Sequence, residues 1–126
     1  MKRMTAVILA CFIAAGCSPA NRNDTILKNG GYGVLRSDCE TLFRSIDPSQ
    51  TGSADPTNYP ASIIVLRPQF VGVHRLEPPV LIIQTSGGFR HEGILVVLGT
   101  NLTYRPTIGH GWVQKELAPG VFEFRE

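Results

Sequence analysis

The chain has 126 residues, of which 43% are hydrophobic and 17% charged, so it is long enough for one domain and too short for two ordinary ones. This apolar content excludes an intrinsically disordered chain, and 13 glycines and 9 prolines exclude long helices as the main architecture. The formal net charge is +2 and like charges never cluster, which excludes the basic surface of a nucleic-acid-binding protein.

Residues 1–16 have the features of a secretory leader. Lys2 and Arg3 precede an apolar run over residues 4–14. As a helix this run is about 16 Å long, at about 1.5 Å per residue, which is half of the ~30 Å hydrocarbon core of a bilayer. We therefore expect a signal peptide that is removed rather than a permanent transmembrane helix.

Small residues directly precede a cysteine at the end of this run, in Ala14-Ala15-Gly16-Cys17. This segment resembles the lipobox of bacterial lipoproteins, although Ala14 stands where leucine is usual. The resemblance implies that the Cys17 thiol receives a diacylglyceryl group and becomes the N-terminus after cleavage. Ser18 implies sorting to the outer membrane, so we expect a lipid-anchored protein of the cell envelope that faces the periplasm. The alternative is an ordinary signal peptide that is cut nearby, with Cys17 incidental.

Removal of residues 1–16 from the 126-residue chain leaves 110 residues, with ten Lys and Arg and ten Asp and Glu. A side-chain charge of zero provides no electrostatic attraction to anionic lipid, so membrane attachment depends on the acyl chains. With Cys11 removed and Cys17 lipidated, Cys39 is the remaining thiol and an intramolecular disulfide is excluded. We expect Cys39 to be buried as a small apolar residue, with pairing to another chain as the alternative.

Residues 17–31 have little apolar content and are rich in asparagine, with one proline and two glycines. This composition predicts that the lipidated cysteine is followed by a flexible tether that ends at residue 31. Alternatively, Ile26 and Leu27 begin a first strand. The remaining residues, 32–126, are expected to form a single globular domain.

Residues 37–46 predict one short amphipathic helix. Ser37 and Glu40 fit a capping box at its start, in which each side chain bonds to the backbone amide of the other residue. Four apolar residues at spacing i, i+3, i+4 and i+7 then form one stripe. These residues are Cys39, Leu42, Phe43 and Ile46. Three prolines and several small polar residues follow in residues 47–60, where we predict a long loop.

Short apolar or β-branched runs bounded by turn residues fill the rest of the chain. They predict strands over residues 62–67, 70–76, 80–85, 93–99, 112–117 and 121–125. Pro119 and Gly120 favour a hairpin between the last two, and the alternation of Phe122 and Phe124 with charged residues predicts a solvent-facing side on the last strand. We therefore predict a mainly β fold, a small antiparallel sandwich or barrel with one short amphipathic helix.

The strand that ends in Arg67-Pro68 and the hairpin sequence of residues 117–122 carry a second resemblance. They are similar to the opening strand and the closing hairpin of small exported PEGA-like β-domains. The resemblance covers about half of the chain and implies a β-sandwich without enzymatic activity.

No catalytic or metal-binding motif is recognisable. The three histidines, His74, His91 and His110, are more than ten residues apart, unlike the closely spaced ligand pairs typical of structural zinc sites. Ser86 lacks the Gly-x-Ser-x-Gly elbow of a serine hydrolase, and Cys39 lies in the apolar stripe of the predicted helix, where a thiol is unreactive. We therefore expect a protein that is not an enzyme and holds neither a metal nor a cofactor, apart from its covalent lipid.

The segment TIGHGW over residues 107–112 is the most distinctive part of the chain. His110 and Trp112, between glycines, are candidate contacts for a partner protein or a glycan, since tryptophan is enriched in binding hot spots. Alternatively, Trp112 is the first buried residue of the next strand.

We expect a binding or scaffolding module that the lipid anchor holds near its partner in the cell envelope. Two alternatives remain open. The first is an envelope inhibitor or exclusion lipoprotein that blocks a lytic enzyme or phage entry with residues 107–112 or 86–92. The second is a small hydrolase or metal-handling protein.

Overall fold

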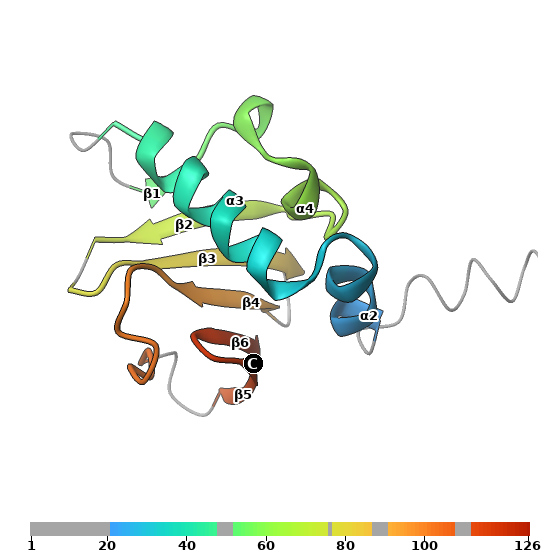
Figure 1. Cartoon of the computed structure of the whole chain (residues 1–126), viewed down its shortest axis with the longest axis vertical. Coiled ribbons are helices and arrows are strands. Elements are labelled where there is room, and N and C mark those ends of the chain that lie inside the picture. Colours follow the sequence, from blue (N-terminus) through green and yellow to red (C-terminus); the bar gives the residue numbers. More distant parts are fainter. Residues whose placement is uncertain (1–20, 48–51, 76, 87–90, 108–111) are drawn as a thin grey trace, which may run out of the picture.

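The computed structural model describes residues 21–47, 52–75, 77–86, 91–107 and 112–126. In this part of the chain, six strands form one antiparallel sheet in the order β1-β2-β3-β4-β6-β5 (Figure 1). The strands are β1 (Gly52–Ser53), β2 (Phe70–His74), β3 (Val80–Ser86), β4 (Glu92–Val97), β5 (Val113–Ala118) and β6 (Val121–Arg125). The predicted mainly β, antiparallel class is confirmed, and because β1 and β5 remain as edges, the sheet is not closed into a barrel.

The strands from β2 onward lie where the sequence predicts them, to within about two residues at each end. Their β-branched and apolar runs suit a pleated surface that is covered on both sides. The hairpin between β5 and β6 is also confirmed, with Gly120 at φ 76°, a conformation that glycine adopts without strain. The expected solvent-facing side of β6 holds only at its end, where Arg125 is exposed, because Val121 is fully buried and Glu123 is half-buried and bonded to Arg22.

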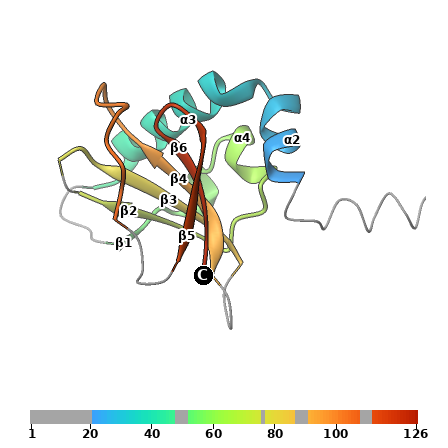
Figure 2. The same ribbon diagram turned by 90° about the horizontal axis from the view of Figure 1, so that it is seen from below.

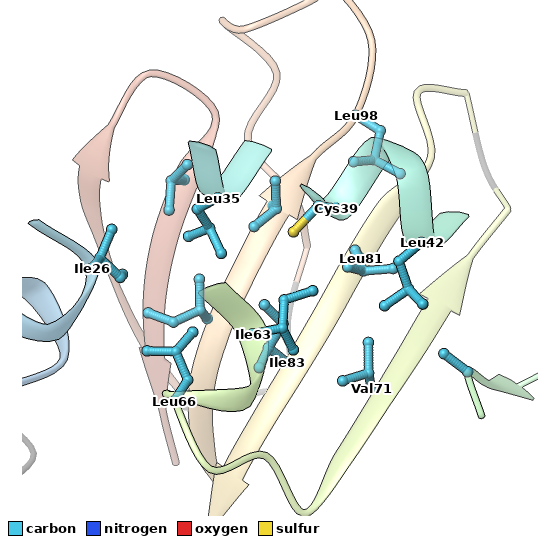
Figure 3. Packing of buried hydrophobic residues seen from close by; sticks show 14 residues of the cluster. Ile26, Leu35, Cys39, Leu42, Ile63, Leu66, Val71, Leu81, Ile83 and Leu98 are labelled. Carbon is cyan, nitrogen blue, oxygen red and sulfur yellow. The ribbon is translucent and has the colours of Figure 1, made fainter. Parts of the chain in front are cut away.

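The main core lies between one face of the sheet and the helices. These are α2 (Asn21–Lys28), α3 (Gly31–Ser45) and α4 (Ala61–Ile64), and Figure 2 shows them on the same side of the sheet. Leu35, Cys39 and Leu42 point from α3 toward the sheet, where they meet residues such as Leu81 (Figure 3). Each is at most 2% exposed, so the predicted apolar stripe is confirmed as the face that packs.

The helix predicted over residues 37–46 begins six residues earlier, at Gly31. Ser37 is therefore an interior residue of α3 and not its cap. Glu40 does not fold back on the helix start; its carboxylate accepts a hydrogen bond from the Gly99 backbone amide, at 2.8 Å. Leu35 extends the buried stripe by one turn, and this packing stabilises a first turn that contains two glycines.

The flexible tether predicted over residues 17–31 is wrong for residues 21–28, which form α2, and for Gly31, where α3 begins. Residues 17–20 lie outside the described residues. The alternative of a strand at Ile26 and Leu27 is also wrong. Ile26 is 2% exposed and belongs to the main core, so even a segment with little apolar content packs on the core through a well-placed residue.

The strand predicted over residues 62–67 is wrong, because residues 61–64 form α4. Pro60 is the N-cap of α4, where its missing N–H removes no helical hydrogen bond, and the Ile64 amide donates to the Pro60 carbonyl at 3.0 Å. Ile63 enters the core, and the Ser62 hydroxyl donates to Asp38 of α3, at 2.6 Å. Tertiary contacts therefore override the β preference of Ile63, Ile64 and Val65.

The long loop predicted over residues 47–60 contains β1 and a 3-10 turn, η1 (Pro56–Asn58). Between them Ala54 is buried, and its amide donates to the Val71 carbonyl at 2.8 Å. Residues 48–51 lie outside the described residues. None of the helices in the described ranges is long and apolar enough to cross a membrane.

Candidate functional site

The face of the sheet that points away from the helices is called the open face here. Side chains alternate along β3, so that Leu81 and Ile83 lie under the helices while Val80, Ile82 and Gln84 lie on the open face. Both sets are largely apolar. A second apolar cluster therefore forms on the open face, although no α-helix of the described chain covers it.

A pocket of about 340 Å³ lies on the open face. Val80, Ile82 and Gln84 of β3 form the middle of its floor. The neighbouring strands extend the floor with Phe70, His74, Leu95 and Phe124. The floor thus spans four adjacent strands, β2, β3, β4 and β6, which are paired in one sheet.

The wall of the pocket comes from the segment between β4 and β5. It contributes Tyr104, Pro106, Thr107 and Trp112, and residues 108–111 within it lie outside the described residues. Trp112 stacks on Phe124 of the floor, with 5.6 Å between the ring centroids and 9° between the ring planes. Floor and wall are therefore joined by direct aromatic contact.

The Trp112 ring also stacks with His91, at 5.6 Å between centroids and 13° between planes. His91 is itself held by Glu126, whose carboxylate accepts from the His91 amide at 3.0 Å and contacts the ring Nδ1. These hydrogen bonds hold the pKa of the Glu126 carboxyl below its usual value. Trp112 thus stacks with two rings, one in the floor and one just before β4, which joins the wall of the pocket to the sheet.

The pocket is suited to an apolar ligand. Its volume falls within the roughly 300–1,000 Å³ typical of small-molecule sites, and its lining is mainly aliphatic and aromatic. His74, Gln84, Tyr104 and Thr107 supply the few polar groups. The described lining contains no aspartate or glutamate, so a carboxylate or phosphate near the pocket meets no acidic lining residue.

Some of the predicted site residues lie in the described part of the chain and others lie outside it. Cys17 and His110 lie outside the described residues. Trp112 is half-buried in the pocket wall, so it is both a packed residue and a candidate ligand contact. His74 lies in the floor and His91 behind Trp112, and the described residues hold no cluster of three metal-ligating side chains.

Cys39 is fully buried in the main core, as predicted. Burial raises the pKa of its thiol far above the usual value, and the neighbouring Asp38 carboxylate acts in the same direction. A thiol that stays protonated among leucines is a poor nucleophile. Cys39 is therefore a packing residue of the main core.

The sequence analysis did not predict the floor of the pocket, although the sequence contains a signal for it. The runs in β3 and β4 are apolar at consecutive positions, which indicates cover on both faces of the sheet. On the second face, Tyr104 and Trp112 from the segment between β4 and β5 pack against these apolar residues. Comparisons with protein-family models, with curated proteins and with solved structures find no match for this chain.

Proposed function

We propose that this chain is a lipid-anchored binding module of the cell envelope, whose ligand places an apolar group in the pocket on the open face. The observation that carries the proposal is the 340 Å³ pocket with its mainly aliphatic and aromatic lining. A concave and mainly apolar surface with a few polar groups is typical of a binding site. Binding removes that surface from water and so provides the driving force.

The few polar groups of the pocket orient the ligand. Gln84 offers both a donor and an acceptor. His74 of β2, which pairs with Val80 at the opposite end of β3, offers a ring nitrogen. A ligand with an apolar body and one polar end satisfies both kinds of lining. Ligand binding alone explains the composition of the pocket lining, which agrees with a binding role.

The anchor is supported by the sequence Ala14-Ala15-Gly16-Cys17 after an apolar run that is too short to span a bilayer. Two acyl chains on one diacylglyceryl group provide the two signals that stable attachment requires. Held at the outer membrane and facing the periplasm, the module meets an envelope partner or ligand at high effective concentration, so weak contacts suffice.

The anchor predicts a specific labelling result. When cells are fed an alkyne analogue of palmitate, the wild-type chain should be labelled and should fractionate with membranes. Cys17→Ser should lose the label because the thioether has no sulfur to form on, whereas Cys39→Ser should keep it. Equal labelling of wild type and Cys17→Ser would contradict the anchor.

The pocket predicts a binding result that can be read directly, because Trp112 is the only tryptophan and lines the pocket. The test uses residues 18–126 exported behind an ordinary signal peptide, a lipid-free chain that keeps every described residue. The dye 8-anilino-1-naphthalenesulfonate should bind, gain fluorescence and quench Trp112 by energy transfer. Ile82→Phe, which adds volume to the floor, should weaken binding by about tenfold, or about 1.4 kcal/mol.

Ile64→Phe is the matched control, since it makes the same change on the helix side at a residue that is 55% exposed. It should leave the affinity for the dye unchanged. Equal affinity in wild type and Ile82→Phe, with both variants folded, would show that the dye binds elsewhere and would contradict the pocket.

A further inference from the structure

The start of α2 is fastened to the sheet. The Arg22 guanidinium contacts Glu92 at 2.7 Å and Glu123 at 3.2 Å, and its Nε donates to the Thr85 hydroxyl at 3.2 Å. The Arg22 side chain is only 11% exposed. Four residues later Ile26 enters the main core. The first residue of the helix, Asn21, is therefore fixed in position relative to the strands.

Four peptide steps separate Asn21 from Cys17. A fully extended chain covers at most about 3.6 Å per residue, so the two positions are no more than about 14 Å apart. If Cys17 carries the lipid, as in the proposed function on which this step rests, the start of α2 lies within that distance of the bilayer surface. One end of the sheet then lies close to the membrane, and no long tether separates the domain from the bilayer.

The aromatic wall of the pocket lies at that same end of the sheet. Glu123, which holds Arg22, is followed directly by Phe124, whose side chain points to the opposite face and carries the Trp112 ring. Glu92, the second partner of Arg22, follows His91, the residue that covers Trp112. The anchored end of the sheet and the Trp112 end of the pocket therefore coincide, on opposite faces of the sheet.

The pocket extends along β3 as well as across the four strands of its floor. Its floor runs from Val80 to Gln84, and four steps of about 3.4 Å make this stretch about 14 Å long. Tryptophan favours the boundary between apolar and aqueous surroundings, because its ring is apolar and its N–H seeks a partner. An acidic headgroup meets no acidic side chain in the described lining. We propose that the ligand is an acyl chain of a membrane lipid, which enters the pocket from the adjacent bilayer past Trp112.

Bromine on an acyl chain tests the proposal, because it quenches tryptophan fluorescence only at close range. The lipid-free chain of residues 18–126 is titrated with stearic acid that carries bromine in mid-chain. We expect saturable loss of Trp112 fluorescence and displacement of 8-anilino-1-naphthalenesulfonate by unbrominated stearate. Ile82→Phe should weaken both effects about tenfold, and Ile64→Phe should leave both unchanged.

The second arm tests the bilayer as the source. The anchored wild-type protein in vesicles of phosphatidylglycerol with brominated chains should lose Trp112 fluorescence, and anchored Ile82→Phe should lose markedly less. Equal loss in both would mean that Trp112 touches the bilayer without a chain in the pocket, which overturns the proposal.

The outcomes separate the two levels of the interpretation. If the dye binds but stearate neither quenches Trp112 nor displaces the dye, the acyl-chain ligand is wrong while the pocket remains a binding site. If neither the dye nor stearate binds, the proposed binding function fails as well. If stearate binds but brominated vesicles have no effect, the ligand is an acyl compound that does not come from the bilayer, and the proposed route is overturned.

Discussion

Gly93→Ala is expected to lower the free energy of unfolding by about 4 kcal/mol, among the larger effects of a single substitution. Gly93 lies in β4 between β3 and β6, beside the irregular register of β3 between Gln84 and Ser86. A Cβ at Gly93 would stand 2.0 Å from the Ile83 carbonyl oxygen and 2.9 Å from the Gln84 Cα. Both are backbone atoms, so the two central strands must separate to make room. Denaturant unfolding followed by circular dichroism measures the change.

Gly33→Ala is the matched control for this prediction. Gly33 lies in the first turn of α3, and nothing stands within 4 Å of a Cβ placed there. Alanine in a helix is favoured over glycine by about 0.5–1 kcal/mol, so Gly33→Ala should stabilise the protein slightly. A similar small effect at both positions would contradict the close approach of β3 and β4.

Arg22→Met is expected to cost about 2–3 kcal/mol, because it removes the cation from between two carboxylates that are 19% and 16% exposed. Methionine keeps an unbranched apolar stem but is shorter than arginine and supplies no donor. The Glu92 and Glu123 charges then remain beneath α2 without compensation from Arg22. The largest local change should be faster hydrogen exchange of the α2 backbone amides, measured by mass spectrometry.

Two further variants isolate the role of the charges. Arg44→Met makes the same change at an exposed position of α3 and should shift stability by no more than about 0.5 kcal/mol. Adding Glu92→Gln and Glu123→Gln to Arg22→Met should recover part of the lost stability, since the carboxylate charges that have lost Arg22 disappear. Glu92 should account for most of the recovery, because Glu123 still has Arg125 at 3.5 Å. Unchanged exchange of α2 in Arg22→Met would contradict the fastening of this helix to the sheet.

The strands could be predicted because their signals are local. Alternating or continuous apolar runs between prolines and glycines placed β2 to β6 correctly, and Pro119 with Gly120 placed the last hairpin. The buried stripe that contains Cys39 was also visible, since helical spacing appears directly in the sequence.

The N-terminal helices could not be predicted, because tertiary contacts form them. Residues 21–28 have few apolar residues, and α2 depends on the burial of Ile26 and on the ion pairs of Arg22. The partners of Arg22, which are Glu92 and Glu123, are 70 and 101 residues away from it along the chain. In α4 the β-branched residues mimic a strand, and only the packing of Ile63 and the bond from Ser62 to Asp38 favour the helix.

The candidate site was predicted in part. Trp112 was singled out from its type and its neighbours, and it does line the pocket. Phe70 and Leu95 were not, because lining a pocket depends on which face of the sheet the helices leave uncovered. Which face the helices leave uncovered depends on the order of the strands and on the handedness of their connections, and a pattern of apolar residues specifies neither.

Mass spectrometry of the folded, lipid-free chain of residues 18–126, purified from the periplasm without detergent, tests the pocket most directly. Wild type should carry a non-covalent apolar small molecule that 8-anilino-1-naphthalenesulfonate displaces. Ile82→Phe should carry much less of it, and Ile64→Phe should carry as much as wild type. An empty wild-type protein that also fails to bind the dye, or an equal load in wild type and Ile82→Phe, would contradict a ligand site on the open face.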